Sequence, residues 1–214
     1  MPRVVTVRRM VAGLLCALTL APTAVHATTV RKHLTIIELL EQSELIVRGR
    51  VTKLSDGVDV RGVPYTEVTL QIAESLKGTP GRELTFRQFG LLAPKKMPDG
   101  RVNLMVTPAA WASFTKGQES IFFLRRPASW TGLRTTAGLG QGQFRVSGAG
   151  AANSVENSGL FERVVVDPGL LAEPEQRVLS TTRGAVNTRG FSMLVKRAVA
   201  EKWIEHGRMR HADR

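Results

Sequence analysis

Short segments of alternating apolar and polar side chains, separated by glycine- and proline-rich turns, constrain the fold of this 214-residue chain most. The clearest is "SELIVRGRVTKL" at residues 43–54, whose two sides are Leu45, Val47, Gly49 and Val51 against Arg48, Arg50 and Thr52. A period of two is typical of a β-strand with one buried side. We therefore expect Val47 and Val51 to pack inside and Arg48 and Arg50 to point outward.

Further segments of this kind follow at short intervals. They are "YTEVTLQIAESL" (65–76), "ELTFRQF" (83–89), "ESIFFLRR" (119–126), and a closing pair formed by "GLRTTAGL" (132–139) and "GQFRV" (142–146). Five or six short strands with glycine at the bends and no helical pattern between them favour a small antiparallel barrel or sandwich. In a barrel, Gly49 would let the first strand coil sharply.

Two helices are expected outside these strands. Thr35 and Glu38 form a capping-box pattern that starts a short helix over residues 36–42. Near the other end, apolar residues recur at helical spacing: Phe191, Leu194, Val195, Ala198 and Val199. This predicts a basic amphipathic helix that docks on the barrel or on a partner, with fraying of the last turns. Such a helix can also lie on an anionic membrane.

The first 27 residues have the pattern of an export signal. Three arginines precede an apolar run at residues 11–20, and Val25-His26-Ala27 matches a small-x-small cleavage site. The mature protein is predicted to start at Thr28 and to be periplasmic or secreted. Its later segments fall short of the roughly 20 apolar residues needed to span a bilayer, so we predict no transmembrane segment in the mature chain.

Cysteine content and charge narrow the chemistry. Cys16 is the only cysteine and lies in the predicted signal, so the mature protein would have neither disulfides nor thiol catalysis. Losing the three signal arginines lowers the formal charge from +12 to +9. This charge favours anionic partners.

The predicted domain organisation has four parts. Residues 1–27 are the signal peptide, and residues 28–150 form an OB-like barrel domain. Residues 151–190 read as a polar linker that includes one strand, "LFERVVV", and residues 191–214 as the C-terminal helix and tail. The fold class is therefore mainly β, a small antiparallel OB-like barrel with a short N-terminal helix and a C-terminal helix.

Catalytic motifs are absent from the sequence. It has no HExxH, no P-loop, no GxSxG elbow and no GxGxxG between a strand and a helix. His33 is a lone histidine beside basic residues, and two acidic pairs, Asp56 with Asp59 and Glu173 with Glu175, are interpreted as solvated surface groups. We assign no catalytic residue, no metal ligand and no cofactor.

The order of the motifs resembles a known domain. "SELIVRGRVTKL", "YTEVTLQIAESLKG" and "FTKGQESIFFL", within residues 34–148, are similar to the netrin-like domain of the OB-fold class and to uncharacterised secreted bacterial proteins of similar size. Tissue inhibitors of metalloproteinases resemble this layout. They bind the protease zinc through an amino-terminal cysteine, whereas the mature chain here would begin with Thr28. The resemblance therefore implies a fold and transfers no functional residue.

The candidate ligand-binding residues are the outward Arg48 and Arg50, together with basic residues that have aromatic neighbours: Arg87 beside Phe86 and Phe89, and Arg125 and Arg126 near Trp130. OB-folds bind nucleic acid or sugars through such surfaces, although no specific nucleic-acid motif is present. A merely solvated outer face is the alternative for Arg48 and Arg50. We expect an exported, non-enzymatic binding module whose partner is an unknown protein or polyanion of the envelope. The other hypothesis is an exported hydrolase or protease-inhibitor-like protein with a site in the loop of residues 90–118.

Overall fold

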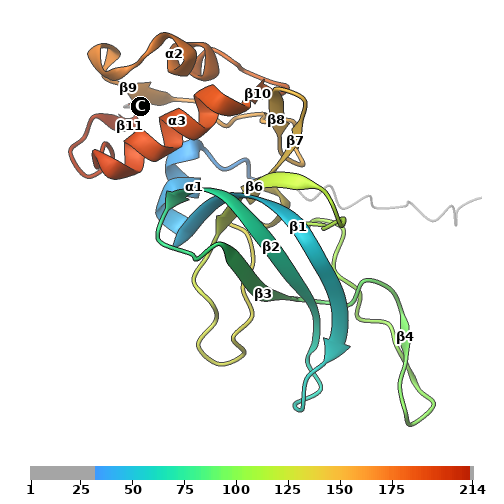
Figure 1. Cartoon of the computed structure of the whole chain (residues 1–214). Helices are drawn as coiled ribbons and strands as arrows, with labels where there is room; N and C mark the ends of the chain where they lie inside the picture. The colour runs from blue at the N-terminus through green and yellow to red at the C-terminus, as the bar shows by residue number, and fades with distance from the viewer. Residues whose placement is uncertain (1–31, 213–214) are drawn as a thin grey trace, which may run out of the picture. The chain divides into compact units, whose positions relative to one another are not determined.

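A seven-stranded antiparallel sheet forms the framework of the computed structural model, which describes residues 32–212 (Figure 1). From one edge to the other, the order is β10-β8-β7-β6-β1-β2-β3. In chain order these strands are β1 (Leu45–Val58), β2 (Pro64–Lys77), β3 (Glu83–Phe89), β6 (Glu119–Leu124), β7 (Gln143–Ser147), β8 (Gly150–Ala152) and β10 (Val186–Asn187). Two small pairs complete the strands: β4 (Lys95–Lys96) with β5 (Val102–Asn103), and β9 (Val164–Val166) with β11 (Met209–His211). The mainly-β prediction is confirmed.

The predicted closed barrel is not found. Strands β3 and β10 stand at opposite ends of the sheet order, and no pairing in residues 32–212 joins them. The segment "GLRTTAGL" is the reason in part, since only Thr136 forms an isolated bridge to Leu124. Gly138 then takes a left-handed conformation and the short 3-10 helix η1 (Leu139–Gly142) follows. The expected closing strand is thus a turn, and the sheet stays open.

Strands β1 and β2 are each 14 residues long and make the longest pairing of the sheet. The register between them shifts at three places, one of them between Arg48 and Gly49. Gly49 is buried, and a β-carbon there would lie 2.8 Å from the carbonyl oxygen of Gln71. Glycine therefore allows the two backbones to approach closely at this point, a structural role for the glycine inside the arginine-bearing segment.

Buried apolar residues lie on both faces of β1. Val47 and Val51 belong to a cluster with Leu70 and Phe122 on one face. Ile46, one residue away and therefore on the other face, belongs to a larger cluster that includes residues of α1 (Ile36–Gln42) and α3 (Thr188–Ala200). The predicted one-sided burial of this strand is thus too simple at its first residues, where helices cover the second face.

The first helix begins as its sequence predicts. The Thr35 hydroxyl accepts a hydrogen bond from the backbone N–H of Glu38, and a Glu38 carboxylate oxygen accepts one from the Thr35 N–H at 2.9 Å. This is the reciprocal capping box. The helix spans Ile36–Gln42, as expected, and buries Ile36 and Leu39 fully.

The segment after residue 150 folds onto the same core. Residues 151–190, expected to be a polar linker, contain β9, β10, the short 3-10 helix η2 (Pro168–Leu170) and α2 (Glu173–Leu179). The Phe191 ring on α3 lies 4.8 Å from that of Phe144 and 6.1 Å from that of Phe123. This segment and the N-terminal strands therefore belong to one compact unit, which begins at His33.

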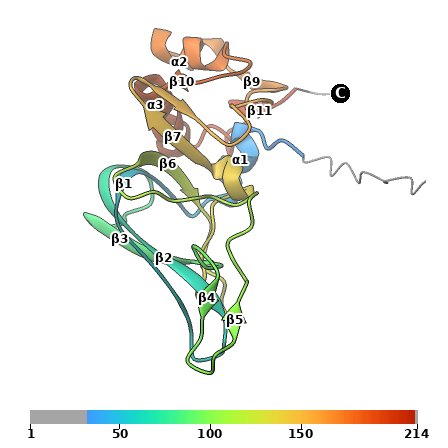
Figure 2. The same ribbon diagram turned by 90° about the vertical axis from the view of Figure 1, so that its right-hand side faces the viewer.

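The end of the chain is also ordered through His211. The α3 helix ends at Ala200, Trp203 is fully buried, and β11 pairs with β9. The predicted fraying of the last turns is therefore wrong, because a buried tryptophan and a strand pairing hold them. The helices gather at one end of the unit, whereas the β1–β2 turn and the β4–β5 hairpin lie at the other (Figure 2). Residues 1–27, predicted as a signal, lie outside the described residues.

Candidate functional site

The predicted anion-binding arginines of β1 are engaged with carboxylates. Val47 and Val51 are buried and Arg50 is exposed, as the alternation predicts. An Arg50 guanidinium nitrogen lies 2.8 Å from a carboxylate oxygen of Glu119, and Arg48 Nε lies 3.6 Å from the other oxygen. Both arginines thus share one glutamate, which neutralises part of the predicted basic surface.

A second glutamate, Glu74, also lies near Arg48. Arg48 Nε lies 4.0 Å from Glu74, and Lys196 Nζ on α3 lies 3.7 Å from the same glutamate. Arg50 donates a second hydrogen bond to the carbonyl oxygen of Gly117 at 2.7 Å. The guanidinium groups of Arg48 and Arg50 therefore have intramolecular partners, and an incoming anion would have to compete with them.

The other three predicted arginines have separate surroundings. Arg87 Nε donates to Glu67 at 2.8 Å, and its guanidinium carbon lies 4.2 Å from the centre of the Tyr65 ring. Arg126 lies 3.5 Å from Glu44, which also accepts from Arg134 at 2.7 Å. Arg125 is exposed. Arg48 and Arg50 share Glu119, whereas Arg87 pairs with Glu67 and Arg126 with Glu44, so the five arginines do not form one binding site.

Exposed apolar side chains, in contrast, concentrate at one end of the sheet. Eight large hydrophobic residues of the described chain are exposed. Seven of them lie in three loops, at residues 59–63, 92–106 and 126–133. We call these seven residues the distal apolar surface: Val60, Leu92, Val102, Leu104, Met105, Val106 and Trp130. The eighth, Val165, lies in β9, away from these loops (Figure 1).

Asp56, near the end of β1, holds the second of these loops (92–106) against the strand that leads into the first (59–63). Its carboxylate accepts a hydrogen bond from the Leu92 N–H at 3.0 Å and another from Lys95 Nζ at 2.9 Å. Burial raises the pKa of Asp56, but the bonds from Lys95 and Leu92 and the charge of Lys95 outweigh burial and hold that pKa below its usual value. The ionised carboxylate therefore fixes the start of the 92–106 loop against β1.

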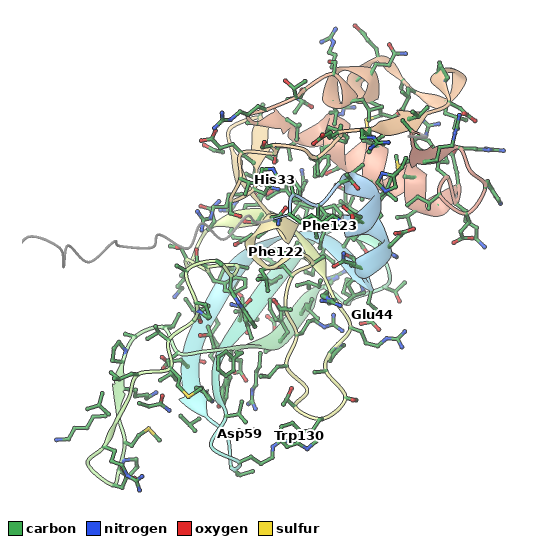
Figure 3. All side chains as sticks on the ribbon, turned by 180° about the vertical axis from the view of Figure 1, so that it is seen from behind. His33, Glu44, Asp59, Phe122, Phe123 and Trp130 are labelled. Carbon is green, nitrogen blue, oxygen red and sulfur yellow. The ribbon has the colours of Figure 1, made fainter. Side chains whose placement is uncertain are left out.

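The third loop is joined through Arg61 in the β1–β2 turn. Arg61 donates to the carbonyl oxygen of Trp130 at 2.6 Å, and its guanidinium carbon lies 5.1 Å from the centre of the Trp130 ring. Asp59 pairs with Arg61 at 3.2 Å; the backbone bond from Val63 is the largest influence on the Asp59 pKa, which lies below its usual value. Figure 3 shows Asp59 and Trp130 side by side at this end.

The long loop is anchored where it leaves the sheet. The Leu91 N–H donates to Met105, and the Thr107 N–H donates back to the Leu91 carbonyl, both at 2.9 Å. Beside this anchor is a cavity of about 240 Å³, lined largely by apolar residues that include Leu92, Pro108 and Trp111. The loop therefore has a fixed base and an exposed apolar outer part.

Groups with catalytic potential lie elsewhere or are paired. His33 Nδ1 lies 3.0 Å from the carbonyl oxygen of Ser158, and residues 32–212 contain no group of three or more His, Cys, Asp or Glu arranged to hold a metal. Asp56 and Asp59 are paired with Lys95 and Arg61. The expectation of surface solvation is wrong for Glu175, which is fully buried.

Glu175 belongs to a hydrogen-bonded network among α2, α3 and the residues after α3. Its carboxylate lies 2.6 Å from Arg197, which also donates to Glu201 at 3.0 Å. Glu201 in turn accepts from the indole N–H of Trp203 at 2.8 Å. The network thus joins α2, α3 and Trp203, and it lies outside the 90–118 loop.

Comparisons with known proteins assign this chain to no family. No protein-family model matches the sequence, and the curated proteins include no significant match. Within residues 32–212, none of the helices has the length and apolar character needed to cross a bilayer.

Sequence reasoning found parts of the distal apolar surface but not the whole. It placed a site in the loop of residues 90–118 under the hydrolase or inhibitor hypothesis, and it noted Trp130 as an aromatic neighbour of Arg125 and Arg126. It missed Val60, whose only signal is an apolar residue within the turn "DVRGV". The joining of the loops by Asp56 and Arg61 has no local sequence signal.

Proposed function

We propose that this chain is an exported, non-enzymatic binding module that contacts its partner through the distal apolar surface. The observation that carries this proposal is that, among residues 32–212, seven of the eight exposed large hydrophobic residues gather at one end of the unit. Scattered apolar residues on a surface need no explanation, whereas a concentrated exposed group marks an interaction site.

The fixed geometry of the loops supports the proposal. Asp56 and Arg61 bond the loops to β1 and the β1–β2 turn, so less conformational entropy is lost when a partner binds. The composition of the 90–118 loop also favours binding over hydrolysis. The loop has no histidine, and its one carboxylate, Asp99, pairs with Arg101 at 2.9 Å.

The netrin-like and OB-type relationship is part of the same proposal. It is supported by the order of β1, a loop and a long β2 that ends at Lys77 and is followed by Gly78. Lys77 Nζ donates to the carbonyl oxygen of Leu40 at 2.7 Å and so satisfies the end of α1. Export is supported by the signal pattern of residues 1–27.

Site-specific photo-crosslinking in the source cells tests the proposal. A photoreactive amino acid replaces Leu104 in one version of the full chain and Val165, as the matched control, in another. We expect a discrete adduct, with protein or with lipid, from position 104 and none from position 165. Absence of an adduct at 104, or equal adducts at both positions, would contradict the proposed function.

A further inference from the structure

Three separate loop tips carry the distal apolar surface. Val60 is fully exposed, and the exposed fractions of Leu104 and Trp130 are 71% and 74%. They come from the β1–β2 turn, the loop after β5 and the loop after β6. A folded protein partner needs a surface matched to such separate projections, whereas the boundary between headgroups and acyl chains adapts to each side chain.

Trp130 has the chemistry of a residue at a membrane interface. Its ring has an apolar body and a polar N–H, a combination that places tryptophan at the level of lipid headgroups. Arg61 lies against this ring and is itself held by Asp59. A cation and an aromatic ring are thus presented together beside the fully exposed Val60.

The charges around these tips complement an anionic surface. Loops 59–63, 92–106 and 126–133, taken with the partners Asp56 of Lys95 and Glu44 of Arg126, contain five cations and four carboxylates, an excess of one positive charge. Lys96 in β4 is exposed and pairs with no carboxylate in the part of the chain that the structure describes. A surface lysine of this kind is attracted to anionic lipid.

From these three observations we propose that the distal apolar surface docks on an anionic lipid bilayer, with Val60, Leu104 and Trp130 entering the interface and Lys96 facing the headgroups. This inference rests on the proposed function, because it names the partner of the same surface. The helical end of the unit, with α2 and α3, then points away from the lipid (Figure 2).

Vesicle sedimentation tests the inference. The chain is prepared from Thr28, so that the apolar run at residues 11–20 cannot bind lipid and the compact unit from His33 stays whole. The probes are vesicles of phosphatidylcholine alone and of phosphatidylcholine mixed with phosphatidylglycerol. We expect binding to the mixed vesicles that weakens about tenfold or more in the double variant Leu104→Ser/Trp130→Ser, since two apolar side chains lose their burial.

Matched control variants distinguish binding through this surface from nonspecific binding to lipid. Val165→Ser should leave binding unchanged, since Val165 is the exposed apolar residue away from the three loops. Lys96→Glu should weaken binding to the mixed vesicles, while Arg82→Glu, at an exposed arginine near the other end of β2, should not. Equal loss in the test and control variants would overturn the inference.

The two proposals fail in distinguishable ways. A protein adduct at position 104 without binding to mixed vesicles would overturn lipid docking and leave the proposed function standing. Equal binding to both kinds of vesicle would overturn the role of anionic headgroups. No adduct and no vesicle binding would overturn both proposals.

Discussion

At the scale of single residues, the balance of charges decides what the basic side chains can do. Arg50 is exposed and Arg48 is half-buried, and Glu119 lies within ion-pair distance of both. An exposed ion pair contributes little to stability, commonly below about 1 kcal/mol. At Arg50, however, the hydrogen bonds to Glu119 and Gly117 occupy donors that an anion would need. Exposed apolar residues have no comparable internal partners, which is why the distal apolar surface is the stronger candidate.

Asp56 gives a pH-dependent prediction at this scale. Because its folded-state pKa lies below the usual value of about 3.9, its stabilising bonds are present above that pH and are lost as pH falls through the lower folded pKa. We expect amide exchange at Leu92 to accelerate as pH falls below about 4, beyond the intrinsic change in exchange rate. The variant Asp56→Asn should show fast exchange already at neutral pH.

Asp99→Asn is the control for this measurement. Asp99 pairs with Arg101 inside the same loop and does not bond to β1, so the exchange of Leu92 should stay as in the unmodified chain. We expect a local effect, below about 1 kcal/mol, because Asp56 is partly exposed to solvent. Slow exchange at Leu92 in Asp56→Asn would contradict the anchoring role.

At the scale of elements, the C-terminal half completes the core that the N-terminal strands begin. Phe123 of β6, Phe144 of β7 and Phe191 of α3 pack their rings together and are all fully buried. The short strand β8 lies across the expected boundary at residue 150, and β10 pairs with it. The rings of Phe123 and Phe144 would therefore meet water in a chain that ended at residue 150.

This arrangement predicts how the protein responds to losing Phe191. We expect Phe191→Ala to lower the free energy of unfolding by about 3–5 kcal/mol, through lost burial and the cavity left between β6, β7 and α3. Residues 28–150 alone should show no cooperative thermal transition. Calorimetry of both proteins checks this, and a cooperative transition in the fragment would show that α3 is dispensable to the core.

Local patterns predicted the elements better than their assembly. The helix over residues 36–42 and the strand at 83–89 follow from a capping box and from alternation, both of which are local. The open sheet does not follow in this way, because residues 132–139 alternate like a strand yet turn at Gly138. The polar composition of residues 151–190 likewise hides Val178 and Val186, which are buried by elements distant in sequence.

At the scale of the whole molecule, the sheet separates two ends with different surfaces. One end holds the helices, the larger buried cluster and the network around Glu175. The other end holds the distal apolar surface, whose loops come from three distant parts of the sequence (Figure 1). The sequence indicated a site in the loop at 90–118, but only the fold brings Val60 and Trp130 to the same end.

The central claim is that binding occurs at the distal apolar surface, and amide hydrogen exchange tests it most directly. The chain from Thr28 is compared alone and with envelope membranes from the source cells. We predict slower exchange in residues 59–63, 92–106 and 126–133, with little change around Arg48, Arg50 and α3. Protection confined to β1 around Arg48 and Arg50 or to α3, or no protection anywhere, would contradict the claim.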